Sequence, residues 1–188
     1  MDVTTQFDPG TSSIRTSGEY ETEAEACAAL DAILAKHPTV FEVAKEVRGW
    51  YVQGKSRCEP KRPRIDRILI PKRRLLDAGW KHGAIGIEAK TSGKKAGRAV
   101  SQALDYHRAN FEWRGFLIEC DWIFMWPMQR VTNDLGSVMV NNRIGTAEPL
   151  GESGIVFMAD ATRAIQVRDD GDLYVCNELK TGRKMGSR

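Results

Sequence analysis

The sequence predicts an α/β fold, with a mixed central β-sheet flanked by helices. Segments whose apolar residues recur every three to four positions alternate with short apolar runs that are typical of strands. At 188 residues, the chain is long enough for one domain with a full hydrophobic core. We therefore expect the order helix, helix, strand, strand, helix, strand, helix and then small strands, with residues 19–177 forming a single domain.

The first two elements are expected to be helices. Residues 1–18 are polar and lack any periodicity, which predicts a flexible N-terminal tail. Thr22 and Glu25 then form a capping-box pattern ahead of a helix that ends before Pro38. A second helix is expected next, because apolar residues again recur at helical spacing: Phe41, Ala44 and Val47.

The chain is organised around two expected strands, at residues 64–70 and 84–90, joined by a long basic connection. Asp66 lies in the first strand, and Glu88 and Lys90 end the second. Residues i and i+2 of a strand share a face, so Glu88 and Lys90 point the same way. If Asp66 lies opposite them, two carboxylates and an ammonium converge, and burying this group without a partner would be costly. A hard, oxygen-seeking cation such as Mg²⁺ would resolve that cost.

The second half of the chain is expected to contain a long helix, further strands and a short helix. Gln102 and Tyr106 lie one turn apart on the long helix, so their side chains meet the same surface. Residues 178–188 are basic and polar, which predicts a C-terminal tail. The other elements are expected as a helix at 95–111, strand segments at 115–120 and 122–126 broken near Asp121, a helix at 132–142, a loop at 145–154, strands at 155–158, 164–167 and 173–176, and a tight turn at 169–171.

Positive charge is concentrated around the first of the two organising strands. Residues 55–74 hold nine bases against two acids, whereas residues 1–35 hold seven acids against one base. A basic block next to a metal site suits a polyanionic substrate; a solvated basic loop is the alternative interpretation. We expect contacts to the DNA backbone from five basic residues: Lys72, Arg73, Arg74, Lys94 and Lys95.

The composition argues against a membrane protein and against a zinc site. No apolar run approaches the roughly 18 residues that a membrane span needs. The cysteines are far apart and never form a C-x-x-C pattern, which favours reduced thiols in a cytoplasm. They are Cys27, Cys58, Cys120 and Cys176.

Together, Asp66 and the run Glu88-Ala89-Lys90 resemble the signature of the PD-(D/E)xK nuclease superfamily. Gln102 and Tyr106 resemble the Gln-x-x-x-Tyr motif of its RecB-like, phage-type exonuclease branch. The resemblance spans residues 46–106, roughly a third of the chain. It implies a restriction-endonuclease-like core and a cytoplasmic protein of a bacterial cell or a phage-infected host.

The resemblance also implies roles for individual residues. Asp66 and Glu88 would be direct ligands of Mg²⁺, for which Mn²⁺ would substitute, and the backbone carbonyl of Ala89 would complete the shell. Lys90 would orient the attacking water or stabilise the phosphorane. Glu46, from a helix before the Asp66 strand, would hold a second ion or position water. Two further residues would bind the DNA backbone or brace the site: Gln102 and Tyr106. No iron–sulfur cluster is expected, because the clustered cysteines of the nucleases that carry one are absent.

The function expected from these residues is a Mg²⁺-dependent deoxyribonuclease that hydrolyses phosphodiester bonds. An exonuclease of recombination, repair or phage DNA metabolism is the first reading. The alternatives are a non-catalytic nucleic-acid-binding protein on the same fold and a structure-specific, junction-resolving endonuclease. An exposed cross-strand ion pair without chemistry also accounts for Asp66, Glu88 and Lys90. The sequence does not determine the polarity of cleavage or whether the substrate is DNA or RNA. It also leaves open whether one or two metal ions bind and whether the protein forms a homo-oligomer.

Overall fold

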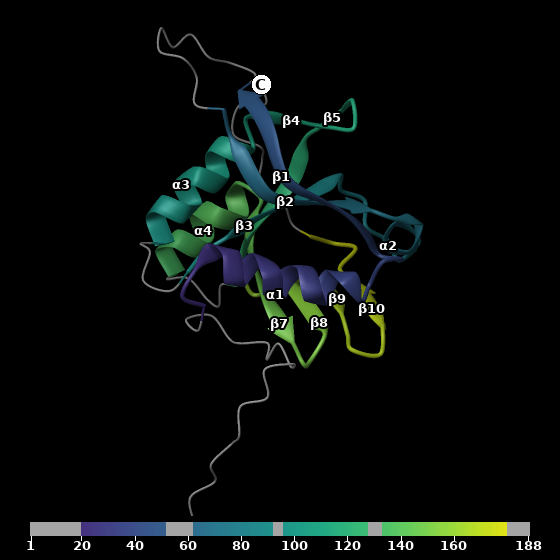
Figure 1. The fold of residues 1–188 in the computed structure, drawn as a ribbon. Coiled ribbons are helices and arrows are strands. Elements are labelled where there is room, and N and C mark those ends of the chain that lie inside the picture. The colour runs from purple at the N-terminus through teal and green to yellow at the C-terminus, as the bar shows by residue number, and fades with distance from the viewer. Residues whose placement is uncertain (1–19, 52–61, 92–95, 128–132, 180–188) are drawn as a thin grey trace, which may run out of the picture.

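A mixed sheet of ten strands runs through the part of the chain that the computed structural model describes, residues 20–51, 62–91, 96–127 and 133–179 (Figure 1). Its order is β10-β9-β8-β7-β6-β3-β2-β1-β4-β5. The strands are β1 (Phe41–Tyr51), β2 (Arg64–Pro71), β3 (Ala84–Ala89), β4 (Ala109–Trp113), β5 (Phe116–Ile118), β6 (Cys120–Trp126), β7 (Ile144–Leu150), β8 (Gly154–Ala159), β9 (Thr162–Val167) and β10 (Leu173–Val175). The helices are α1 (Glu23–Ala35), α2 (Arg73–Asp77), α3 (Ala96–Tyr106) and α4 (Asn133–Asn141).

The sheet is parallel only at its centre. Strands β1, β2 and β3 pair antiparallel, β3 then pairs parallel with β6 and β6 parallel with β7, and β7 to β10 pair antiparallel. The crossovers between the parallel strands contain α3 and α4, as parallel pairing requires a long connection. Strands β4 and β5 extend the sheet beyond β1. The expected α/β fold with a mixed sheet flanked by helices is confirmed.

Hydrophobic clusters cover the two faces of the sheet. One cluster joins α1 to β3 and β8 through buried residues such as Leu30, Ile87 and Phe157. The other joins α3 and α4 to the central strands through residues such as Ala103 and Met125. Figure 1 shows α1 crossing the sheet, and residues of α3 and α4 belong to the same cluster. The carboxyl end of β3 therefore lies between two helical layers.

The expected first helix is confirmed as α1. The backbone N–H of Glu25 donates to the hydroxyl of Thr22 at 3.1 Å, and the Glu25 carboxylate accepts from the N–H of Glu21 at 3.0 Å. These bonds satisfy N–H groups that a helix start leaves without partners. The indole N–H of Trp126 donates to the carbonyl of Ala26 at 2.8 Å. The first turns of α1 are thus fixed against the end of β6.

The expected second helix is wrong, because residues Phe41–Tyr51 form the strand β1. Glu46 has a left-handed backbone conformation, with φ of 51°, which is uncommon in a strand residue. On either side of it, Ala44 and Val47 are both buried in the same cluster, although they are three residues apart. The regular alternation of the strand is interrupted at Glu46, and the apolar spacing consequently imitates a helix.

Three smaller expectations differ from the structure. The expected loop at 145–154 is mostly strand β7. The sequence did not predict this strand because Gly145 and Pro149 are residue types that are depleted in strands. The long helix ends at Tyr106, and β4 follows it. The break in the strand region lies at Glu119, between β5 and β6 and slightly before the expected position near Asp121. The helix near 132–142 and the strands near 155–158, 164–167 and 173–176 are confirmed.

Some expectations fall on residues that the structure does not describe. They are the N-terminal tail at 1–18, the C-terminal tail from residue 180, Cys58, Lys94 and Lys95. In the described ranges, Cys27, Cys120 and Cys176 are free cysteines. None of the helices seen there has the length and apolar character to cross a membrane.

Candidate functional site

Asp66 lies near the start of β2, beside the end of β3. Its Oδ2 accepts a hydrogen bond of 2.7 Å from the backbone N–H of Ala89. Burial raises the pKa of Asp66; the Ala89 N–H and the Lys90 ammonium oppose the rise, while the carboxylates of Glu46 and Glu23 add to it. A cation bound beside Asp66 would offset both the burial and the neighbouring acids, and so would favour the charged carboxylate.

Glu88 and Lys90 lie at the carboxyl end of β3 and are only 3% and 8% exposed. The backbone N–H of Lys90 donates to the carbonyl of Trp126 at 2.7 Å, which holds the strand end against β6. The Lys90 ammonium pairs with Oε1 of Glu88, whereas Oε2 of Glu88 is buried without a hydrogen-bond partner among the described residues. Burial and nearby Asp66 raise the pKa of Glu88 to about 7, against the lowering effect of Lys90. A buried oxygen without a partner is costly and calls for an explanation.

Helix α3 braces Lys90 through Gln102 and Tyr106. The Lys90 ammonium donates to Oε1 of Gln102 at 3.1 Å, and the Gln102 amide donates to the hydroxyl of Tyr106 at 2.7 Å. That hydroxyl donates in turn to the backbone carbonyl of Arg64 at 2.8 Å. Three hydrogen bonds therefore connect β3, α3 and β2, and the expected meeting of Gln102 and Tyr106 on one surface is confirmed. Their contact with DNA stays a prediction.

Glu23, in the first turn of α1, is an acidic residue that the sequence reasoning missed. Its Oε1 lies 3.8 Å from the Lys90 ammonium, and its side chain is 42% exposed. The Thr22 capping box was a signal that an acid would occupy this first turn. The sequence did not predict that the start of α1 lies beside the end of β3, because these segments are far apart along the chain.

Glu46 lies on β1 and not on a helix, so the expected position was wrong. Its carboxylate pairs with Arg64 at 3.1 Å and with Arg67 at 3.3 Å. The buried Arg67 also pairs with Asp31 of α1 at 2.7 Å. Glu46 thus belongs to an ion-pair network near Asp66, whose pKa it helps to raise. Its two arginine partners compete with a metal for the carboxylate, and its metal-binding role stays a prediction.

The basic residues of the connecting segment lie away from the carboxylates. Lys72, Arg73 and Arg74 follow the far end of β2, which is five residues from Asp66, roughly 16 Å along an extended strand. Lys72 donates to the carbonyl of Pro38 at 2.7 Å, and Arg74 donates to that of Gly171 at 2.5 Å. Their expected position next to the site is therefore wrong, and their contact with DNA stays a prediction. The other expected phosphate contacts lie outside the described residues: Lys94 and Lys95.

The donor set suits a magnesium ion held by few protein groups. No cluster of three or more His, Cys, Asp or Glu residues arranged for a metal occurs in the described residues. Mg²⁺ commonly uses one or two carboxylates and keeps several waters, so Asp66 and Glu88 meet that requirement. Oε2 of Glu88 is buried and makes no hydrogen bond within 3.5 Å in the described residues, although the Tyr106 hydroxyl is close enough to lower the pKa of Glu88; this oxygen is the observation that favours a cation here. The adjacent backbone carbonyl of Ala89 is the third oxygen expected from the sequence.

The site therefore brings together five of the expected residues at the end of β3: Asp66, Glu88, Lys90, Gln102 and Tyr106. It adds Glu23 and assigns Glu46 to a neighbouring network. Comparisons with protein-family models, with curated proteins and with solved structures each gave no match. The functional proposal consequently rests on the residues and their geometry.

Proposed function

We propose that this protein is a Mg²⁺-dependent nuclease of the PD-(D/E)xK type. The observation that carries the proposal is the position of Lys90, whose ammonium contacts both Glu88 and Gln102 in a buried site next to Asp66. The alternative is that Asp66, Glu88 and Lys90 form only an exposed cross-strand ion pair with no catalytic role. In that case their side chains would be in contact with water. Instead, Glu88 and Lys90 are nearly inaccessible and one carboxylate oxygen has no partner among the described residues.

The order of elements also supports the proposal. A helix, three antiparallel strands, a second helix and a parallel strand (α1, β1, β2, β3, α3 and β6) form the part of the fold that contains the site. This α/β arrangement is compatible with the restriction-endonuclease-like core that the sequence resemblance implies, although β1 takes the place of an expected second helix. Because a fold alone does not give a function, the weight of the proposal rests on the site.

Each residue has a distinct role in the proposed reaction. Asp66 and Glu88 would hold the metal, which when bound neutralises phosphate charge and lowers the pKa of a bound water. Lys90 would stabilise negative charge on the phosphoryl oxygens or orient the attacking water, as its compact ammonium suits both tasks. Gln102 keeps the ammonium in place by accepting one of its hydrogen bonds. Tyr106 fixes Gln102 and joins it to the backbone of β2.

A substrate panel tests the proposal and separates exonuclease from endonuclease action. Linear duplex DNA, covalently closed circular DNA and a four-way junction are each incubated with Mg²⁺, with Mn²⁺ and with EDTA. We expect metal-dependent cleavage of the linear DNA that EDTA stops, and none by an Asp66→Ala variant that melts like the wild type. Cleavage of the closed circle would instead indicate an endonuclease, and junction-selective cleavage a resolvase. Binding without cleavage under every metal condition would contradict the proposal.

A further inference from the structure

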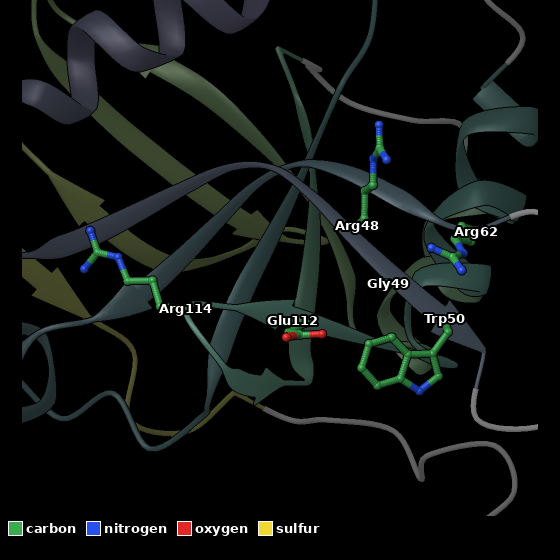
Figure 2. Close-up of a pocket in the computed structure, with 6 residues that line it drawn as sticks. All are labelled: Arg48, Gly49, Trp50, Arg62, Glu112 and Arg114. Carbon is green, nitrogen blue, oxygen red and sulfur yellow. The ribbon is translucent and has the colours of Figure 1, made fainter.

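A second concave site lies where β1 ends and β2 begins, at the same end of this strand pair as Asp66. This pocket of about 510 Å³ is lined by Arg48, Gly49, Trp50, Arg62, Glu112 and Arg114. Figure 2 shows Arg62 and Trp50 toward one end of the pocket and Arg114 at the opposite end, with the Arg48 side chain extending from β1 away from the indole. We call it the arginine pocket. Its volume falls within the range of pockets that hold small organic ligands, and a nucleotide is of that size.

The local structure of β1 explains why the arginine pocket is open and polar. Arg48 and Trp50 are exposed and Gly49 between them is buried, so the two side chains share the outer face of the strand. Trp50 remains 40% exposed, which is unusual for so large an apolar side chain in a chain that buries most of its tryptophans. An exposed indole beside cationic groups provides a stacking surface with charge around it.

Charge in the arginine pocket favours an anionic ligand. Three arginines face one glutamate in its lining. Arg114 is partly engaged, because it pairs with Glu42 at 2.9 Å and its guanidinium lies 4.2 Å from the centroid of a Trp113 ring. Within the described ranges neither Arg48 nor Arg62 forms an ion pair, so these two are the principal candidates for phosphate contacts.

Strand β2 connects the arginine pocket to the candidate catalytic site. Arg48 is the register partner of Arg64, which precedes Asp66 by two residues, roughly 7 Å of strand. The Arg64 carbonyl accepts the hydrogen bond from Tyr106, so β2 links the two sites without an intervening element. Arg62 is four residues from Asp66, at most roughly 13 Å along an extended chain, so a nucleotide held at Arg62 is only a few nucleotides from Asp66.

From these observations we infer that the arginine pocket binds an unpaired nucleotide of the strand that leads to Asp66 and Glu88. The base would stack on Trp50, and the flanking phosphates would contact Arg48 and Arg62. Glu112 marks the base end, because its charge repels phosphate while its oxygens accept hydrogen bonds from base amino groups. Bases in a duplex are already stacked on each other, so an exposed indole selects a single-stranded segment. This inference rests on the proposed function, since it names the substrate as DNA that is single-stranded near the cut.

The test measures equilibrium binding in EDTA, so that it does not depend on cleavage. A labelled single-stranded 20-mer and the matching duplex are titrated with wild type, Trp50→Ala, Trp50→Phe and the Arg48→Ala/Arg62→Ala double variant. The controls are Tyr174→Ala and Arg163→Ala, which change an exposed aromatic and an exposed arginine on β10 and β9, toward the opposite edge of the sheet. Thermal melting verifies that each variant is folded.

Loss of Trp50 should weaken single-strand binding about tenfold or more, with most of the affinity restored in Trp50→Phe and a small effect on the duplex. The double variant should lower the slope of log affinity against log salt by about 1.4, the value for two phosphate contacts. Unchanged affinity and slope in folded variants, or equal losses on both DNAs, would overturn the inference. If the variants lose single-strand binding as expected but wild type never cleaves DNA, the inference about the arginine pocket is supported and the nuclease proposal fails. If wild type cleaves DNA and Trp50→Ala binds single strands normally, the nuclease proposal is supported and the inference about the pocket fails.

Discussion

The ammonium of Lys90 and the side-chain carbonyl of Gln102 are 3.1 Å apart, joined by a hydrogen bond from the end of β3 to helix α3. This bond connects two sequence patterns that are separate along the chain, the Glu-x-Lys of the strand and the Gln-x-x-x-Tyr of the helix. It also fixes the amine on one side while the Glu88 carboxylate holds it on another. The helix motif therefore has a structural task that does not depend on its touching the substrate.

Removing the bracing side chain should slow the reaction without unfolding the protein. We expect Gln102→Ala to lower the single-turnover cleavage rate about 10- to 100-fold, because a group that orients a catalytic side chain acts at that level. Tyr106→Phe should lose about 1 kcal/mol of stability, since the hydroxyl bonded to Arg64 disappears. Ser101→Ala, an exposed change beside Gln102 on the same helix, is the control. A normal rate in Gln102→Ala would mean that the bond to Lys90 has no catalytic consequence.

The two acids near the site should behave differently. Glu46 already pairs with Arg64 and Arg67, so Glu46→Gln should keep cleavage within about threefold of wild type. Glu23 lies 3.8 Å from the Lys90 ammonium, and Glu23→Gln should lower the rate about tenfold or more. Cleavage assays at matched Mg²⁺ concentrations compare the two. The opposite order of effects would identify Glu46 as the acid that assists the metal.

Mg²⁺ should stabilise the folded protein, and more strongly at higher pH. Because the pKa of Glu88 is about 7 when folded, against 4.5 ordinarily, the folded state holds an extra proton between these values and loses stability as pH rises through them. A bound cation offsets that loss and requires the charged carboxylate. At one fixed Mg²⁺ concentration, about 100 times the Kd at pH 8, we expect a rise in Tm of about 5–10 °C at pH 8 and a smaller rise at pH 6, where the protonated carboxyl weakens binding. Glu88→Gln should abolish the rise; an equal rise in that variant would place the ion elsewhere.

The Asp31–Arg67 pair should govern stability at low pH. Burial alone would raise the pKa of Asp31, but hydrogen bonds from Arg67 and Lys45 outweigh it and the pKa is lowered. Its contribution to the free energy of unfolding is therefore present above the unfolded pKa of about 3.9 and is lost as pH falls through the lower, folded pKa. Asp31→Asn should cost about 1–3 kcal/mol at pH 7, because the buried guanidinium of Arg67 loses the nearer of its two charged partners. Urea unfolding from pH 2 to 7 should show the two proteins converging at the acid end, whereas a constant difference would contradict this account.

The strands and helices around the site were largely predictable, and the exception has a physical cause. Short apolar runs at 64–70 and 84–90 identified β2 and β3, and the capping box identified α1. Strand β1 was misread as a helix because its alternation is interrupted at Glu46, where φ is 51°. On either side of Glu46 the strand pairs with β2, and the Glu46 side chain pairs with arginines of β2. The local sequence of β1 does not predict these contacts.

In the candidate site, too, the residues fixed by local sequence patterns were predictable, and those that depend on contacts between distant segments were not. Glu88, Lys90, Gln102 and Tyr106 were found because two residues along a strand and one turn along a helix fix which side chains share a face. Glu23 and the arginine pocket were missed, since both depend on contacts between distant segments. The expected position of three basic residues was wrong because β2 runs away from the site after Asp66, so residues close to Asp66 in sequence lie at the strand's other end. They are Lys72, Arg73 and Arg74.

The cleavage rate of Lys90→Ala tests the central claim most directly, because Lys90 lies where the strand motif, the helix motif and α1 meet. Linear DNA with an unpaired end is cut under single-turnover conditions at saturating Mg²⁺, with Arg163→Ala as the control. We expect Lys90→Ala to lose at least about 100-fold in rate while its far-UV circular dichroism and its DNA affinity in EDTA remain near those of wild type. A folded Lys90→Ala protein that cuts DNA at the wild-type rate would contradict the account.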